Sequence, residues 1–472
     1  MAETEQDKQD HLWGDGADAG MHPALAVISD SLRQDMPLAD ADLRGSAAYA
    51  RALGRCGVLT EDDAELLGST LDTMRDELHE GTWKPKGAED IHTAIEAEVT
   101  RRLPELGGRL HTGRSRNDQV GTAFRLTVMD KIDLIVTALI GVQERILAQA
   151  EVNIDLLMPA YTHMQRAQPI RLSHWILSYF WPLDRDIERF LQLRERCAVL
   201  PLGSGAVAGH PFNIDREWLA SELGFQAISE NSIDAVGDRD FAVEFVFLCS
   251  MVAIHLSRLC EELVIWSSAE FGYVKWRSDL ATGSSLMPNK KNPDLPELVR
   301  GRSAQTLGEV VSMLSLLKGL PHSYQRDLQE DKQPVWRSAY IAHSNLVAIA
   351  AALEGIRFNG DRMEAALTDD TFATEMADIL VDRGMPFRSA YRVVSKIATA
   401  AREKECSIKE IAKEADAELL DPLTLEDIEG LSALQSVERR TATGGTAKKA
   451  VQEQLEEAWD IVELYKERLE IE

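Results

Sequence analysis

The stretch VMDKIDLIVTALIGVQERI, residues 128–146, decides the fold. Its large apolar side chains are spaced four and three residues apart, at Val128, Ile132, Ile135, Leu139, Val142 and Ile146. Charged and polar side chains lie off that stripe, among them Asp130, Lys131, Asp133, Gln143 and Glu144. Such spacing puts the apolar side chains on one face of an amphipathic helix of about six turns. The stretch therefore predicts a long helix.

Further segments have the same character, and they lie at residues 241–271, 305–320, 339–353 and 451–462. Residues 241–271 are apolar on almost all sides, so this helix must be surrounded by other helices, from this chain or from other copies of it. We find no run of alternating strands and no internal repeat. The pattern predicts an all-α fold of three domains: an N-terminal helical domain (1–112), a central long-helix bundle carrying a loop at 282–294 (113–361), and a small C-terminal helical domain (362–472).

The charge of the chain limits its partners. It has 51 basic and 78 acidic residues, a formal net charge of −27. Phosphate backbones and anionic membranes would repel such a chain, so we expect no nucleic-acid or membrane partner. Lysine is scarce, at 16 residues. This acid excess favours a halophilic protein, because high ionic strength screens the repulsion between carboxylates. The alternative is an ordinary acidic cytosolic protein.

Cysteine usage and the N-terminus indicate a cytoplasmic location. The five cysteines (Cys56, Cys197, Cys249, Cys260 and Cys406) have no regular spacing, which fits free thiols in a reducing compartment. The first ten residues are polar and acidic, unlike a signal peptide. The most apolar run, residues 245–254, is interrupted by His255 and Arg258, and we expect it to be too short for a transmembrane helix of ~18 residues.

One loop combines several groups that could carry chemistry. Residues 282–294 read TGSSLMPNKKNPD, with hydroxyls at Ser284 and Ser285, a cation at Lys290 and an amide at Asn292. A mobile loop of this kind could close over a carboxylate, with the lysine and the amide as donors and a serine oxygen at the reacting carbon. A plain turn with a serine cap would use the same residue types.

Polar residues also gather before the long helix. In residues 112–118, Asn117 or Asp118 would make a good N-cap, and the free amides of that helix end attract anions. Capping alone is the simpler interpretation. His163 could be a core histidine, and its nearest neighbour in sequence, His174, lies at no helical metal spacing, so we expect no metal site.

Several motifs together resemble a known family. Residues 282–294 are similar to the signature of the fumarase/aspartase superfamily, whose members eliminate fumarate from succinyl compounds. Residues 110–120 (LHTGRSRNDQV) resemble the version of the first superfamily region found in the argininosuccinate lyase family, which includes the lens δ-crystallins, and residues 161–169 (YTHMQRAQP) are similar to the second superfamily region. Residues 89–92 (EDIH), 324–332 (YQRDLQEDK) and 444–447 (GGTA) extend the resemblance, which runs from about residue 31 to the C-terminus.

The resemblance implies a reaction and an assembly. The reaction is the β-elimination of arginine biosynthesis that splits argininosuccinate into arginine and fumarate, with neither a metal nor an organic cofactor. The assembly is a homotetramer whose central helices pack together into a multi-helix core. Its active sites are shared, because the Asn117, His163 and Ser284 regions meet from three subunits.

The resemblance also assigns roles to residues. The catalytic candidates are Ser284, His163 and Lys290. The substrate-binding candidates are Ser31, His92, Ser115, Arg116, Asn117, Thr162, Asn292, Glu297, Tyr324, Gln329 and Lys332. We favour Ser284 as the base at carbon and His163, with Thr162 nearby, for proton traffic at the leaving nitrogen, although the opposite assignment stays open. Lys290, Asn292 and Asn117 suit stabilisation of the doubly charged carboxylate form that develops after proton removal.

Other functions remain as alternatives. Another lyase of the superfamily could act on adenylosuccinate, aspartate or malate, but residues 110–120 and 324–332 argue against it. A catalytically inactive δ-crystallin-like protein is the alternative from a different class. The chain departs from the family at residues 12–16 (LWGDG), around Ser31 (SDSLRQD), and at Tyr391, where the family usually has histidine.

Overall fold

The computed structural model describes residues 22–414 and 420–470, so the divergent stretch at residues 12–16 lies outside the described residues. The chain is mainly helical and its strands are few and short, which confirms the all-α prediction. The described residues form two compact units, and the predicted division into three domains stays a prediction. The first unit comprises residues 22–136, 187–251 and 304–343, and the second comprises 137–186, 252–303 and the rest from 344.

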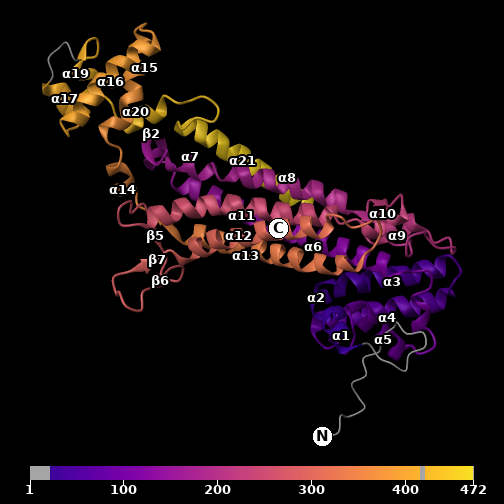
Figure 1. Cartoon of the computed structure of the whole chain (residues 1–472). Helices are drawn as coiled ribbons and strands as arrows, with labels where there is room; N and C mark the ends of the chain where they lie inside the picture. The colour runs from indigo at the N-terminus through magenta and orange to yellow at the C-terminus, as the bar shows by residue number, and fades with distance from the viewer. Residues whose placement is uncertain (1–21, 415–419, 471–472) are drawn as a thin grey trace. The chain divides into compact units, whose positions relative to one another are not determined.

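Five long helices contribute segments to both units (Figure 1). They are α6 (Arg116–Val152), α8 (Phe180–Cys197), α11 (Asp240–Ser267), α12 (Asp294–Leu317) and α13 (Lys332–Gly355). In the first unit the ring of Phe124 packs edge-on against Phe241 at 5.4 Å and Trp336 at 5.6 Å, which joins α6, α11 and α13. In the second unit Gln149 of α6 donates to the carbonyl of Leu353 in α13. The bundle of long helices that the apolar spacing predicts is therefore confirmed.

The remaining elements of the first unit are short or lie before α6. They are α1 (Pro23–Ser29), α2 (Leu32–Asp35), η1 (Met36–Leu38), α3 (Ala39–Arg55), α4 (Glu61–Glu80), α5 (Ile91–Arg102), η2 (Gly107–Arg109), β3 (Val199–Leu200), α9 (Arg216–Glu222), β4 (Ala227–Ile228), α10 (Ser232–Gly237) and η3 (Arg326–Asp331). Strands β3 and β4 pair in parallel. Thr60 caps the start of helix α4, and Gly81 caps its end with a left-handed φ of 72°, a conformation that glycine adopts more readily than other residues.

The second unit contains two hairpins and a further set of mostly short helices. Its elements are β1 (Leu157–Thr162), β2 (Gln165–Arg171), α7 (Leu172–Leu177), β5 (Val274–Trp276), β6 (Thr282–Gly283), β7 (Lys291–Asn292), β8 (Ile356–Phe358), α14 (Gly360–Ala365), η4 (Asp369–Phe372), α15 (Ala373–Asp382), α16 (Phe387–Glu403), α17 (Ile408–Glu414), α19 (Leu425–Glu429), α20 (Ala433–Glu438) and α21 (Lys448–Leu469). Antiparallel pairs join β1 to β2, β5 to β8, and β6 to β7. Helices α15, α16, α17 and α19 enclose a small apolar core of their own, centred on Leu380, Ile397 and Ile428.

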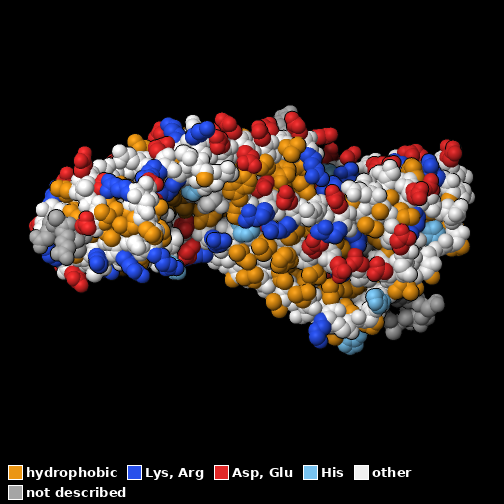
Figure 2. Space-filling view, turned by 90° about the horizontal axis from the view of Figure 1, so that it is seen from above, with side chains coloured by type: hydrophobic (Ala, Val, Ile, Leu, Met, Phe, Trp, Pro, Cys, Tyr) orange, Lys and Arg blue, Asp and Glu red, His pale blue; other side chains and the backbone are white. Residues whose placement is uncertain are grey.

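Helix α11 has the composition of a membrane-spanning helix. Its most apolar 18-residue window reaches a mean hydropathy of 1.7, so the expectation that this run is too short to cross a membrane is wrong on length alone. A core helix passes the same test, and 56% of this window is buried inside the protein. On the face drawn in Figure 2, carboxylates and basic side chains are intermingled with broad hydrophobic areas.

Candidate functional site

Seven of the predicted site residues line one pocket in the first unit. The pocket has a volume of about 130 Å³. Its predicted members are Ser31, His92, Arg116, Asn117, Tyr324, Gln329 and Lys332. Asp35, Glu89, Asp90, Val120 and Arg326 complete the lining. Four separate stretches of sequence, at residues 31–35, 89–92, 116–120 and 324–332, therefore supply side chains to one polar cavity.

The start of α6 presents Arg116 and Asn117 to this pocket. Ser115 stands just before the helix, and its hydroxyl accepts a hydrogen bond from the Asn117 amide at 3.2 Å. Asp118 closes the turn by accepting from the Ser115 amide at 2.9 Å. The prediction that Asn117 or Asp118 is the N-cap is therefore wrong, because the helix begins at Arg116 and already includes both residues. Ser115 shapes this helix end and does not line the pocket.

Asp118 also anchors a second loop. Its other oxygen accepts from the amides of Gly203 at 3.1 Å and Gly205 at 2.8 Å, which ties the stretch 201–209 to the start of α6. Burial raises the pKa of Asp118 to about 6, although these backbone donors and Arg114 favour the ionised form. The carboxylate thus holds the helix end and the glycine-rich loop in one arrangement.

Lys332 brings a buried positive charge to the pocket. It is 4% exposed, and its ammonium lies 2.9 Å from Asp331 and 5.6 Å from the ring centroid of Phe124. Asp331 is fully buried and also pairs with Arg239. Two cations therefore share one carboxylate. In the lining itself Arg116, Arg326 and Lys332 are matched in number by Asp35, Glu89 and Asp90, and the cationic donors among them suit the carboxylates of a ligand.

The other side of the pocket is held by residues around Glu89. Arg326 donates to Glu89 at 2.7 Å and to the Ser29 hydroxyl at 2.6 Å, and Gln329 donates to the Ser29 carbonyl at 3.1 Å. The Ser31 amide donates to the Glu89 carbonyl at 2.8 Å. These bonds place the buried Ser31 in the lining, although the sequence around it departs from the family.

The acidic residues of the pocket differ in how readily they ionise. Burial raises the pKa of Asp35, which accepts a hydrogen bond from Ser31. Burial acts in the same direction on Asp90, but His92, Arg116 and the hydrogen bonds from Thr93 outweigh it and lower the pKa of Asp90. Asp90 caps α5 by accepting from the Thr93 amide at 2.6 Å, which orients the first turn that carries His92.

Thr162 and His163 lie in the second unit, at the tip of a hairpin that the sequence did not reveal. Thr162 pairs with Gln165, so His163 and Met164 form a two-residue turn, with φ values of 54° and 58°. Such a turn normally uses asparagine and glycine. Non-glycine residues held in this region often mark functional sites, because the surrounding structure must support the strain.

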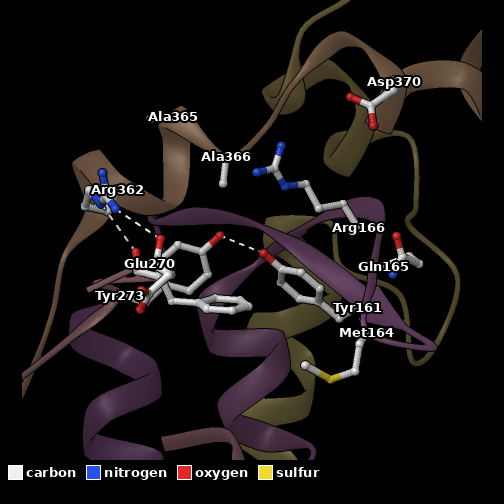
Figure 3. A pocket seen from close by; sticks show the side chains of 11 residues that line it. Tyr161, Met164, Gln165, Arg166, Glu270, Tyr273, Arg362, Ala365, Ala366 and Asp370 are labelled. Atoms are coloured by element: carbon white, nitrogen blue, oxygen red, sulfur yellow. Dashed lines mark hydrogen bonds between the residues drawn. The ribbon is translucent and has the colours of Figure 1, made fainter. Parts of the chain in front are cut away.

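A larger cavity of about 580 Å³ lies against the same hairpin (Figure 3). The hydroxyls of Tyr161 and Tyr273 are 2.8 Å apart in its wall. Arg166 of β2 extends along the cavity and donates to Thr368 at 3.2 Å. Arg362 donates to carbonyls at residues 269–271, just beyond the end of α11. The hydrogen bonds of Tyr161 and Arg166 in the wall of this cavity therefore tie both strands of the hairpin to other parts of the second unit.

The loop 282–294 also belongs to the second unit and is largely exposed. The Ser284 hydroxyl accepts hydrogen bonds from the amides of Leu286 at 3.2 Å and Met287 at 2.9 Å. Asp294 closes the loop by accepting from the amide of Thr282 at 2.9 Å and from its hydroxyl at 2.6 Å. Lys290 is exposed, Asn292 lies in β7, and Glu297 stands exposed in the first turn of α12.

The structure therefore divides the predicted site. The pocket of the first unit gathers candidates for substrate binding, and its lining contains none of the six candidates from the second unit. Those six are Thr162, His163, Ser284, Lys290, Asn292 and Glu297. Within residues 22–414 and 420–470, no group of three or more histidine, cysteine or acidic side chains could hold a metal ion.

Comparison of the sequence with known proteins matches the chain to a family. A family model described as "Lyase" matches residues 19–308, and one described as "Argininosuccinate lyase C-terminal" matches residues 370–464. The argininosuccinate lyase of Roseiflexus sp. (strain RS-1) is 43% identical over 453 residues, which cover 96% of this chain and all of that one. The probable argininosuccinate lyase of Schizosaccharomyces pombe is 41% identical and covers 94% of this chain and 97% of its own length.

Solved structures agree in fold. An EDDS lyase in complex with formate superposes with a TM-score of 0.81 at 26% identity, covering 92% of this chain and 88% of that one. A class II fumarase from Schistosoma mansoni shares the fold at a TM-score of 0.72 and 14% identity, covering 84% and 90%. By sequence over nearly its full length and by fold, the chain belongs to the argininosuccinate lyase family of the fumarase/aspartase superfamily.

Proposed function

We propose that the chain cleaves argininosuccinate into arginine and fumarate, as a step of arginine biosynthesis. The pocket of the first unit carries this proposal, because it brings Arg116, Lys332 and His92 together around one cavity. A substrate with three carboxylates needs several cationic donors, and a chain of net charge −27 must supply them locally. Both stretches that set this family apart, residues 110–120 and 324–332, contribute to the lining.

The reaction removes a proton from the carbon next to a carboxylate and breaks the bond between the neighbouring carbon and the guanidinium nitrogen. In our proposal Ser284 takes that proton, and His163, with Thr162 beside it, moves a proton to the leaving nitrogen. A serine hydroxyl is a weak base, so its alkoxide must be stabilised. The two backbone amides that donate to Ser284 Oγ support this role, since they favour a negative oxygen.

The other candidates bind and stabilise. Lys290, Asn292 and Asn117 are proposed to stabilise the doubly charged carboxylate form. Ser31, His92, Ser115 and Arg116 are proposed to contact or orient the succinyl carboxylates, and Glu297 to face the substrate from the loop side. Tyr324, Gln329 and Lys332 are proposed to hold the amino-acid end of the substrate. The reaction as proposed needs no cofactor.

We further propose a homotetramer with shared active sites. The pocket of about 130 Å³ is smaller than the ~300–1,000 Å³ of usual ligand sites, so other segments must complete it. Leu307, Val311 and Leu314 form an exposed apolar stripe on α12, and Val311 is 64% exposed. An apolar stripe of this kind suits a contact between copies of the chain. The acid excess and the scarcity of lysine support a cytoplasm rich in salt as its location.

Release of fumarate from argininosuccinate, followed by absorbance, tests the activity. Activity on argininosuccinate but not on adenylosuccinate, aspartate or malate supports the proposal. An inert, correctly folded protein would support the δ-crystallin-like alternative. Activity on one of the other substrates alone would instead assign the chain to a different lyase of the superfamily.

Complementation tests the shared site. Ser284→Ala and His163→Asn chains, each inactive alone, are denatured, mixed equally and refolded in high salt. If three subunits build each site, roughly a quarter of the sites in mixed tetramers draw an intact serine and an intact histidine from different chains. No recovery in a mixture shown by mass spectrometry to contain hybrids would place both residues in one chain's site.

A further inference from the structure

Asp42, in α3, is a buried carboxylate that no sequence motif singled out. It is 2% exposed and does not line the pocket. One of its oxygens lies 3.2 Å from Nδ1 of His92, and the other accepts a hydrogen bond from the Gln119 amide nitrogen at 2.7 Å. The Gln119 carbonyl oxygen in turn accepts from Arg116 at 3.1 Å. Asp42 is thus joined to two residues that do line the pocket, His92 and Arg116.

We propose that Asp42 is a positioning residue for the lyase reaction, acting through His92 on one side and through Gln119 and Arg116 on the other. This inference rests on the proposed function. A carboxylate only accepts hydrogen bonds, so Asp42 beside Nδ1 favours the form of the His92 ring in which that nitrogen carries a proton. The same carboxylate turns the nitrogen end of the Gln119 amide toward itself, which leaves the oxygen end for Arg116.

The charges around Asp42 support its ionised state. Burial opposes ionisation, but His92, Arg114 and the hydrogen bond from Gln119 lower the pKa of Asp42 to about 2. His92 also lies within the electrostatic reach of Asp35 and Asp90. Asp42 is therefore ionised in the folded protein near neutral pH.

His92 is left ready for a ligand. It is 2% exposed, and among the described residues its Nε2 has no hydrogen-bond partner. Its Nδ1 and the Asp42 oxygen stand at 3.2 Å without the alignment of a hydrogen bond. Hydrogen bonds of this kind tighten when the substrate binds. A substrate carboxylate in the pocket would then meet Nε2 of a ring whose orientation Asp42 fixes.

The chain offers a matched control. In the second unit Asp186, which is 1% exposed, lies 2.6 Å from Nδ1 of His255. Neither residue lines the pocket of the first unit or the cavity beside the hairpin. Asp186→Asn therefore makes the same chemical change at a buried aspartate–histidine pair outside the site.

The test is a double-mutant cycle on kcat/KM with argininosuccinate, in the full-length protein. Asp42→Asn should lower kcat/KM roughly 10- to 100-fold, the range seen for partners that orient metal-bound histidines. In a His92→Asn background the same change should cost less than about 3-fold, since its main route of action is gone. Asp186→Asn should lower the thermal midpoint and leave kcat/KM within about 2-fold.

Equal costs of Asp42→Asn in both backgrounds would overturn the inference, as would a kcat/KM within about 2-fold of the parent. If Asp42→Asn does not fold, Gln119→Met tests the second branch. It should raise KM more than it lowers kcat, and its effect should disappear in an Arg116→Gln background. An additive cycle there would refute the branch. Fumarate release by the unmodified chain tests the proposed function separately, so the two failures are distinguishable.

Discussion

Replacing Asp331 by asparagine should destabilise the protein more than any change at a surface ion pair. Asp331 is fully buried and is the shared counter-charge of Arg239 and Lys332, which are themselves buried. Asparagine keeps the shape and one acceptor oxygen but removes the charge. Arg239 and Lys332 would then lose the buried carboxylate with which both are paired.

The size of the effect follows from this geometry. Breaking a buried ion pair typically costs ~3–5 kcal/mol. Arg239 keeps a hydrogen bond to the Asp238 carbonyl at 2.7 Å, and Lys332 keeps a long one to the Leu328 carbonyl at 3.4 Å. These partners place the cost at the lower end, about 3 kcal/mol. That is a large part of the ~5–15 kcal/mol that stabilises a typical native protein.

Urea unfolding in dilute buffer and in molar potassium chloride measures this cost. Glu244→Gln is the control, because it removes the partner of Arg196 in an exposed pair and should cost below about 1 kcal/mol. The Asp331→Asn penalty should be the same at both salt concentrations, since mobile ions do not reach a buried pair. A penalty no larger than that of Glu244→Gln, or one that salt removes, would refute the reasoning.

Four further outcomes are expected. Ser284→Ala and His163→Asn should each lower turnover at least ~100-fold, with helix content unchanged by circular dichroism; near-normal turnover of Ser284→Ala would move the base elsewhere. Activity and thermal midpoint should rise steeply from dilute to molar potassium chloride, whereas full activity in dilute buffer would contradict a halophilic origin. The pKa of Asp42 is lowered from 3.8 to about 2, so its contribution of roughly 2 kcal/mol to stability is present above pH ~4 and is lost as the pH falls through about 2. The unfolding free energies of the parent and of Asp42→Asn, measured at several pH values, should therefore converge at low pH. Met164→Gly should raise the unfolding free energy by up to ~1 kcal/mol, since glycine relieves the left-handed turn but gains freedom when unfolded; a loss of stability would show that the methionine side chain outweighs the strain.

The sequence predicted the long helices because their burial is periodic. Alternating spacings of three and four residues are a local property that the segment of α6 follows, whereas α11 was predicted because its segment is apolar on almost all sides. The hairpin that carries His163 could not be found in this way. Its turn is built by His163 and Met164, neither of which is a usual turn residue, and its strands lack a clean alternation of polar and apolar side chains. Tertiary support, which a local pattern does not reveal, holds that turn.

The candidate site was predicted only where motifs name its residues. Ser31, Tyr324 and Lys332 were found through resemblance, and the structure brings them to one pocket. Asp42 and Asp331 were missed, although one stands beside His92 and the other beside Lys332. A lone aspartate in a helix usually faces water. Only the packing of α3 against α5 and α6 shows that Asp42 is buried.

The charges on the surface of this protein and the charges around the pocket of the first unit are arranged differently. The chain carries an acid excess of 27 charges, whereas the cations of the pocket are held by nearby or buried acids of the chain. Lys332 is paired with Asp331, and Arg116 lies 3.8 Å from Asp90. Interactions between exposed charges weaken beyond roughly 10 Å at moderate salt, while pairs inside the protein are screened far less. Salt that screens the surface carboxylates therefore leaves the Lys332–Asp331 pair largely intact, because this pair is buried.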